Sequence, residues 1–208
     1  MFENSTGECE LCITETPIED AINFAESFGK FCTFIVQTRA TRKKVNLELQ
    51  KLYNAQETLK NGWKENDIVI NLENKYEDTD ADRQLVVSNG DIGAIITVED
   101  THFYVKFNHV ETPRKYSLNT QEIDLAYGIT LHKYQGSEAD NVVLILDNFP
   151  RFQSKEITYT GITRAKKYIK IFVPQNTWLA ATSNEEKSNR TTRLSEYICN
   201  KRKLSSTH

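Results

Sequence analysis

The order of hydrophobic patterns along the chain is the feature that most constrains its fold. Residues 16–19 read Thr-Pro-Ile-Glu, which combines an N-cap threonine, a proline at the first helical position and a capping-box glutamate. Apolar residues then recur at helical spacing up to Gly29, and the nearly continuous apolar run 31–36 is typical of a strand buried on both faces. A second helix is expected from Thr41. Helix, strand and helix in this order predict an α/β layer.

The pattern changes after Gly62. Short alternating or β-branched runs follow, with turn candidates at 89–91 and 100–102. The runs cover residues 68–72, 85–87, 94–98 and 103–107. Segments this short predict a small β-barrel.

Around Leu125 the α/β pattern returns. We expect a short helix up to Tyr134, and a last helix in the polar tail after Trp178, where Leu194 and Ile198 have helical spacing. Between them we expect a buried strand at 142–146, a helix near 155–166 and a strand at 168–173. A β insertion therefore interrupts an α/β domain.

Composition limits the class of protein. The 208 residues suffice for one ordinary domain or two small ones, and 38% hydrophobic with 26% charged residues is typical of a soluble globular protein. No run approaches the roughly 18 apolar residues of a membrane span. The first ten residues lack the basic start and apolar core of a secretory signal, so we expect a cytoplasmic protein with no membrane partner. The net charge of -3 argues against indiscriminate polyanion binding, although a local basic patch remains compatible with nucleic acid.

The cysteines do not suggest a disulfide framework. Cys9, Cys12, Cys32 and Cys199 are too few and too scattered, so free thiols are expected. Cys9 and Cys12 form a C-x-x-C pair, but a structural zinc site needs a second pair of ligands, which the four histidines do not supply. We expect no metal bound by this chain.

Two segments concentrate the residues suited to chemistry. In LAYGITLHKYQGSEADNVVLIL, residues 125–146, polar and ionisable groups surround Gly136, where a missing side chain lets a ligand approach closely. In YTGITRAKKYIKIFV, residues 159–173, Arg164 lies late on an expected helix beside a buried strand. A fixed guanidinium suits phosphate oxygens better than lysine does. Both segments therefore point to phosphate chemistry.

These segments resemble a known family. T-x-H-x-x-Q-G-S-E followed by an apolar strand resembles motif V of RecD-like, superfamily 1 DNA helicases, the exodeoxyribonuclease V alpha subunit family, and Y-T-x-I-T-R-A resembles their motif VI. TFIVQTRATRKKVNLELQ is similar to the strand and helix that open their second RecA-like domain, and NDIVINLENKY with VSNGDIGAII is similar to their SH3-like insertion. RTTRL, residues 190–194, resembles their closing helix. The resemblance covers nearly everything from residue 31 onward, in the family's order.

The resemblance implies an α/β fold. A RecA-like parallel-sheet domain, related to P-loop NTPases but without a P-loop, is expected from about residues 1–62 and 125–208. A small SH3-like β-barrel is expected as an insertion at about residues 63–124.

The resemblance also implies roles for individual residues. Arg164 would be the arginine finger that reaches the γ-phosphate of ATP, a group that contributes on the order of 1,000-fold or more to hydrolysis. Gly136 and Glu138 would lie at the nucleotide edge of the same cleft. The residues expected to contact DNA are Thr130, His132, Lys133 and Arg39, with Gln135 between the two sites. Closure around ATP would move motif V and change the grip on DNA.

The phosphate-binding half of an ATP site is missing. A P-loop needs G-x-x-x-x-G-K-[ST], and among eight glycines only Gly29 precedes a lysine, with Phe31 next. ATP with Mg²⁺ would therefore be bound mainly by a first motor domain that this chain lacks, and the chain alone should hydrolyse ATP negligibly. The run 144–147 imitates a Walker B strand ending in Asp147, but it follows motif V and has no Walker A partner, so we reject that interpretation.

The predicted function is thus the C-terminal motor-domain portion of an ATP-dependent DNA helicase, moving 5′ to 3′ and acting in DNA repair. Its partners would be single-stranded DNA and the N-terminal P-loop motor domain of the same helicase. The alternative is a stand-alone, non-catalytic domain that binds nucleic acid or a partner. A Pif-type helicase fits Q-G-S-E and I-T-R-A less well.

Two residues depart from the family pattern. Gly161 replaces the alanine usual in motif VI, and glycine in a helix costs about 1 kcal/mol relative to alanine, so Arg164 is expected to be held less firmly. Tyr134 stands where the family often has alanine or serine. It is either a base-stacking group or a packing variant, and packing is favoured.

Overall fold

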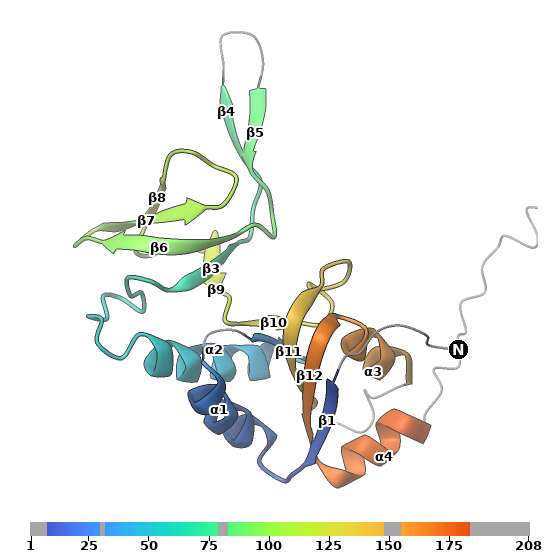
Figure 1. Cartoon of the computed structure of the whole chain (residues 1–208). Helices are drawn as coiled ribbons and strands as arrows, with labels where there is room; N and C mark the ends of the chain where they lie inside the picture. The colour runs from blue at the N-terminus through green and yellow to red at the C-terminus, as the bar shows by residue number, and fades with distance from the viewer. Residues whose placement is uncertain (1–7, 30–31, 79–82, 148–154, 184–208) are drawn as a thin grey trace, which may run out of the picture.

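The computed structural model describes residues 8–29, 32–78, 83–147 and 155–183, and these contain two five-stranded sheets, with helices packed on one of them, and a two-stranded hairpin (Figure 1). The first is a five-stranded parallel sheet in the order β1-β12-β11-β2-β10. Its strands are β1 (Glu8–Ile13), β12 (Ala165–Val173), β11 (Ala139–Ile145), β2 (Thr33–Val36) and β10 (Gly128–Thr130). The expected α/β layer is confirmed.

Helices cover both faces of this parallel sheet (Figure 1). Helices α1 (Pro17–Phe28) and α2 (Arg39–Tyr53) pack on one face, and α3 (Lys155–Ile162) and α4 (Gln175–Ser183) on the other. Neighbouring residues of β2 supply the two cores, because a strand points successive side chains to opposite faces. Phe34 and Val36 join the core under α1 and α2, whereas Ile35 joins the core under α3 and α4.

The starts of the first two helices differ in detail from the sequence pattern. Pro17 begins α1, which ends at Gly29 with φ of 81°. Thr16 makes no side-chain cap and instead donates to the Asp20 carboxylate at 3.1 Å, so the predicted N-cap bond is absent. Helix α2 begins at Arg39, earlier than predicted, because the Thr38 hydroxyl accepts from the Thr41 amide at 3.1 Å.

The second sheet is antiparallel and lies beside the first (Figure 1). Five strands follow the order β8-β7-β6-β3-β9. They are β8 (Arg114–Ser117), β7 (His102–Phe107), β6 (Ile92–Val98), β3 (Ile68–Asn71) and β9 (Ile123–Leu125). Strands β4 (Lys75–Asp78) and β5 (Arg83–Val87) form a separate hairpin that projects away from the rest of the molecule. The sequence runs at 68–72, 85–87, 94–98 and 103–107 all become strands, as predicted.

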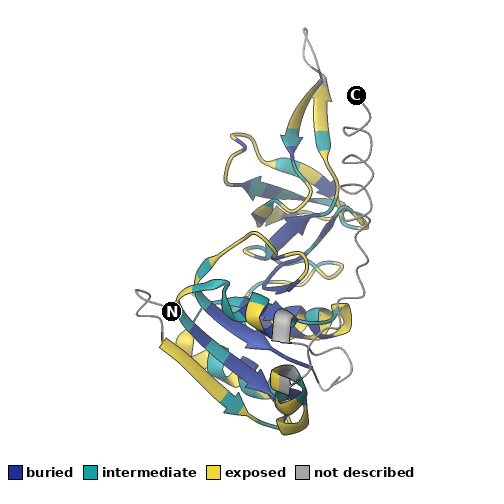
Figure 2. Cartoon of the chain, turned by 90° about the vertical axis from the view of Figure 1, so that its right-hand side faces the viewer, coloured by how far each residue is buried: buried dark blue, intermediate teal, exposed yellow. Residues whose placement is uncertain are grey.

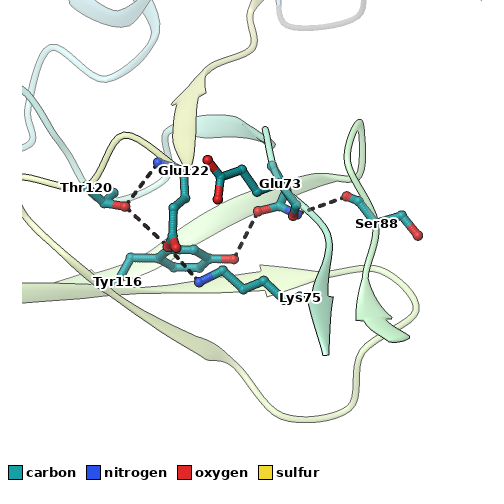
Figure 3. A network of polar contacts seen from close by, with 7 residues as sticks. Glu73, Lys75, Ser88, Tyr116, Thr120 and Glu122 are labelled. Carbon is teal, nitrogen blue, oxygen red and sulfur yellow. Dashed lines mark hydrogen bonds and ion pairs between the residues drawn. The ribbon is translucent and has the colours of Figure 1, made fainter. Parts of the chain in front are cut away.

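A polar network fixes the base of this hairpin to the antiparallel sheet (Figure 3). The Lys75 ammonium lies 2.7 Å from the Glu122 carboxylate and 4.2 Å from the centre of the Tyr116 ring. The buried Tyr116 hydroxyl donates to Asn71 at 3.4 Å, and the Asn71 amide donates to the Ser88 carbonyl at 3.0 Å. Cross-strand contacts of this kind hold the two strands of the hairpin together where they leave the sheet.

Buried hydrogen bonds also connect the two sheets. The Asp67 carboxylate is fully buried and accepts from Gln50 at 2.5 Å, from Asn54 at 2.9 Å, and from Tyr127 at 2.9 Å. Its fourth donor is the Lys64 amide at 2.8 Å. These partners come from the end of α2, the start of the insertion and the approach to β10, so Asp67 holds the three segments together.

Three expectations are corrected or fall outside the described residues. The helix predicted up to Tyr134 is wrong, because Leu125 ends β9, residues 128–130 form β10 and hydrogen-bonded turns follow. The helix expected near 155–166 ends at Ile162, and β12 begins at Ala165. The resemblance at 190–194, with Leu194 and Ile198, lies outside the described residues. Over the described ranges no helix is long and apolar enough to cross a membrane.

Candidate nucleotide and nucleic-acid site

The segment between β10 and β11 connects opposite ends of the parallel sheet. Thr130 is paired with Val36, which is paired with Ile145 at the carboxyl end of β11. Ala139, at the amino end of β11, is paired with Ala165. Six residue steps at about 3.3 Å separate the two levels, so the segment returns over roughly 20 Å. One stretch of chain therefore contributes side chains to both ends of the sheet.

At the amino end, Arg164 contacts this segment. Its guanidinium donates to the Ser137 carbonyl at 3.3 Å, to the Thr160 carbonyl at 3.1 Å and to the Thr163 hydroxyl at 3.3 Å. The Arg164 carbonyl in turn accepts from the Ala139 amide at 3.0 Å. The acceptors described for the guanidinium are neutral oxygens, so these bonds orient its charge without cancelling it.

Gly136 and Glu138 lie on the same short loop. Gly136 has φ of 88°, a conformation that favours glycine, and no atom lies within 4 Å of where its Cβ would stand. The exposed Glu138 carboxylate lies 3.3 Å from the Lys166 ammonium. The structure thus brings Gly136, Glu138 and Arg164 to one end of the sheet.

At the carboxyl end, three of the predicted DNA-contacting residues line a single cavity of about 260 Å³. They are Arg39 at the start of α2, Thr130 at the end of β10, and Lys133 in the turn that follows. Leu72 and Asp124 of the insertion and Arg42 of α2 complete the lining. The cavity therefore lies between the helical layer and the antiparallel sheet.

The electrostatics of this cavity favour an anion. The first turn of α2 contains no acidic residue, although the helix dipole places partial positive charge there. Partial burial, followed by the nearby charge of Arg42, lowers the pKa of Lys133, and Arg39 acts in the same direction. Asp124 opposes them. Cations that disfavour one another in this way are stabilised by a bound phosphate.

The remaining candidates of this segment do not line the cavity. His132 and Gln135 are exposed. Tyr134 is 7% exposed and packs in the core beneath α3 and α4 with Ile129 and Leu131, so the packing interpretation is confirmed.

Gly161 has a role that the sequence comparison did not reveal. A Cβ at this position would lie 2.9 Å from the Leu144 Cδ2 atom, closer than real Cβ contacts. Glycine therefore lets α3 approach the sheet closely. Arg164 is oriented by three hydrogen bonds, and the expectation that glycine at position 161 holds it less firmly than alanine stays a prediction.

Three residues considered for metal binding in the sequence have structural surroundings. Asp147 is buried and its Oδ1 atom accepts from the Thr41 hydroxyl at 2.5 Å, which joins the end of β11 to the start of α2. Cys9 and Cys12 lie three residues apart on β1, so their side chains point to opposite faces of the sheet. The described residues include no group of three or more histidine, cysteine or acidic side chains placed to hold a metal ion.

Sequence reasoning missed the acidic residue of the cavity. Asp124 lies beside Ile123 and Leu125 at the border of the insertion, and nothing in its neighbourhood distinguishes it in sequence. Its position follows from the register of β9 against β3, in which it is paired with Ile70. Arg42 is followed directly by Lys43 and Lys44 in the sequence. Only the structure shows that Arg42 lines the cavity and that the two lysines do not.

Known proteins resemble this chain over part of its length. The family model of the UvrD-like helicase C-terminal domain matches residues 125–171, which include all of segment 125–146 and most of segment 159–173. The chain is 39% identical over 103 residues to the RecBCD enzyme subunit RecD of Buchnera aphidicola from Acyrthosiphon pisum, which is 47% of this chain and 17% of that protein. Over these residues the chain is similar to the C-terminal region of RecD-like helicases.

The matched relatives are much longer than this chain. An uncharacterised protein of Methanocaldococcus jannaschii is 34% identical over 124 residues, 52% of this chain and 11% of that protein. The chain thus spans less than a fifth of the length of these relatives.

Solved structures confirm the fold of the RecD-like region. A Pif1 helicase from Bacteroides in complex with ADP-AlF3 and single-stranded DNA matches with a TM-score of 0.50 and 13% identity, over 79% of this chain and 51% of that one. Pif1 helicases studied on forked double-stranded DNA match with a TM-score of 0.50 and 16% identity, over 79% and 49%. The likeness establishes a RecA-like α/β fold with an SH3-like insertion.

Proposed function

We propose that this region is the second motor domain of an ATP-dependent DNA helicase, which grips single-stranded DNA at one end of its sheet and completes an ATP site at the other. ATP with Mg²⁺ is bound mainly by a P-loop motor domain of the same helicase. Arg164, Gly136 and Glu138 face the nucleotide, and Thr130, Lys133 and Arg39 face DNA phosphates, with His132 and Gln135 on the connecting loop. On the resemblance alone, we extend the proposal to 5′ to 3′ movement and to DNA repair in the cytoplasm.

The observation that carries this proposal is the continuity of the segment from Thr130 to Ala139. Its first residue lines the basic cavity, and the Ser137 carbonyl near its end accepts from the Arg164 guanidinium at 3.3 Å. A displacement of Arg164 on nucleotide binding therefore acts on the same backbone that positions Lys133. Leu131 and Tyr134 anchor the segment in the core, so it moves as a unit rather than bending freely.

The chemical role of Arg164 follows from its charge and its setting. Phosphoryl transfer is accelerated chiefly by positioning and by stabilising the charge on the transferring oxygens. A planar guanidinium oriented by neutral acceptors keeps that charge available and suits two phosphate oxygens at once.

The test uses a helicase chain in which a P-loop domain accompanies these residues. Arg164→Ala should lower the kcat for ATP hydrolysis by roughly 1,000-fold, while ATP binding and single-strand binding change little, because the arginine contributes at the transition state. Lys167→Ala is the matched control, since Lys167 is an exposed cation near the same strand start that pairs with Asp140 at 2.6 Å. Unchanged turnover in Arg164→Ala would remove the arginine-finger assignment.

A stand-alone nucleic-acid-binding role is the second candidate. The observation that favours it is that three basic residues, Arg39, Arg42 and Lys133, line one cavity at a distance from the Arg164 end of the sheet. That role predicts single-strand binding by the 208-residue chain together with no change in turnover when Arg164 is replaced in a helicase that has a P-loop domain.

A further inference from the structure

An ion pair joins helix α2 to the antiparallel sheet inside the basic cavity. The Arg42 guanidinium of α2 donates to the Asp124 carboxylate of β9. The Arg42 side chain is 16% exposed and the Asp124 side chain is 38% exposed. The pair is therefore accessible to a ligand from the carboxylate side.

The hydrogen-bonding capacity of Arg42 is incompletely used. Its Nε atom is buried and has no acceptor among the described residues, and the guanidinium offers five N–H donors in all. Asp124 is the one acidic residue lining the cavity, against three basic ones, Arg39, Arg42 and Lys133. The cavity has more positive charge than its own carboxylate neutralises.

We propose that Asp124 is a displaceable counter-ion, and that a phosphate of single-stranded DNA replaces its carboxylate on Arg42. This inference rests on the proposed function, because it names a further phosphate ligand and its competitor in the same DNA cavity. A phosphate matches the guanidinium fork as well as a carboxylate does and also interacts with Arg39 and Lys133. The released Asp124 carboxylate returns to water and repels the bound strand, which limits affinity and favours release.

Other contacts keep the two sheets together when the pair opens. The Asn46 amide donates to the Leu125 carbonyl at 2.7 Å, and its oxygen accepts from the Gly128 amide at 2.6 Å. The buried Asp67 carboxylate holds a second junction through four donors. Exchange of Asp124 for phosphate therefore breaks one contact between α2 and the antiparallel sheet and leaves the rest of the interface in place.

The experiment measures binding of a fluorescent oligothymidylate to the 208-residue chain by anisotropy over a series of salt concentrations. In the native chain the Asp124 carboxylate accepts a hydrogen bond from the Leu125 amide at 2.9 Å, and Asp124→Asn keeps an oxygen that can accept this bond. Binding should become about threefold to tenfold tighter, since exposed and half-buried ion pairs are of modest strength. The slope of log affinity against log salt should steepen by about 0.7, because Arg42 no longer releases a carboxylate that recruits a cation.

The controls separate this inference from the function on which it rests. Asp100→Asn removes an acid of the same insertion that is 94% exposed and pairs with Lys60, and should leave binding unchanged. In Arg42→Ala/Asp124→Asn the gain should disappear. Asp124→Ser provides a second variant, and the thermal unfolding midpoint verifies that each protein is folded.

Unchanged or weaker binding by both folded Asp124 variants would overturn the inference. If Lys133→Ala and Arg39→Ala still weaken binding in that case, the DNA cavity of the proposed function stands. If neither basic residue affects binding, or the chain does not bind the strand, both the cavity assignment and the inference fail.

Discussion

Gly161 illustrates how a single missing side chain lets a helix approach a sheet and positions the arginine that follows it. It lies on α3 three residues before Arg164, and a Cβ there would meet both terminal carbons of Leu144, at 2.9 and 3.1 Å. Leu144 is 1% exposed in the central strand region of the sheet, so it has little room to move. The close approach of α3 brings the Arg164 guanidinium within 3.3 Å of the Ser137 carbonyl.

We predict that Gly161→Ala destabilises the protein by about 1 kcal/mol. Helix propensity alone predicts a gain of about 1 kcal/mol, but overpacking a dense core costs typically 1–3 kcal/mol. Urea unfolding measures the difference. The companion variant Gly161→Ala/Leu144→Val has a shorter side chain at the contact and should recover part of the loss. A stability gain in the single variant would show that the contact relaxes freely.

At the scale of elements, α2 lines the basic cavity at one end and joins a buried hydrogen-bond network at the other. Its amino end presents Arg39 and Arg42 to the cavity, where the helix dipole is unfavourable to cations. Its carboxyl end supplies Gln50 and Asn54 to the buried Asp67 network. The basic residues at the start of α2 therefore lower helix stability slightly. A bound anion at this end of the helix would offset that cost.

Charge reversal at the start of α2 should separate stability from binding. Arg39→Glu should raise the free energy of unfolding by about 0.5 kcal/mol, because an acidic residue suits a helix amino end, and it should weaken oligothymidylate binding. Lys51→Glu is the matched reversal in the last turn of the same helix, where Lys51 pairs with Glu48 at 2.8 Å. It should lower stability slightly and leave binding intact. Equal binding losses in the two variants would indicate a general effect of net charge.

At the scale of the whole molecule, the junction between the sheets depends on a buried carboxylate. Burial raises the pKa of Asp67 above its usual 3.8, although hydrogen bonds from Gln50, Lys64, Asn54 and Tyr127 oppose the shift. A carboxyl group with a raised pKa in the folded state holds its proton to higher pH than in the unfolded chain. Its contribution to stability therefore falls as pH rises from about its usual pKa through its raised one.

We predict that Asp67→Asn destabilises the protein by about 2–4 kcal/mol although it removes a buried charge. All four partners of the carboxylate are donors, so an amide NH₂ would face two of them and leave buried groups unpaired. Urea unfolding near neutral pH measures the loss, with the exposed Asp140→Asn as control. Stability within about 0.5 kcal/mol of the original chain would mean that the network relaxes around the amide.

The sequence alone determined the elements with strong local signals. Helical spacing with Pro17 and Gly29 marked α1, apolar runs marked β2, β11 and β12, and short alternating runs marked four strands of the insertion. These signals are local because they arise from the periods of helix and strand and from backbone preferences of proline and glycine. The two candidate site segments, 125–146 and 159–173, could also be recognised from the sequence, because the residues of each motif are contiguous.

The tertiary structure decided what depends on pairing between distant residues. Strand β1 is mostly exposed (Figure 2) and alternates in polarity only over Glu8–Leu11, so its place is set by pairing with β12. Strand β10 has only three residues, and the sequence pattern predicts a helix there. Only its pairing with β2 shows that these residues form a strand. The contact of Gly161 with Leu144 and the pairing of Arg42 with Asp124 likewise join residues far apart in sequence, which no local period encodes. Sequence motifs therefore predict the candidate residues at the two ends of the sheet. The cavity between α2 and the insertion follows only from how these elements pack.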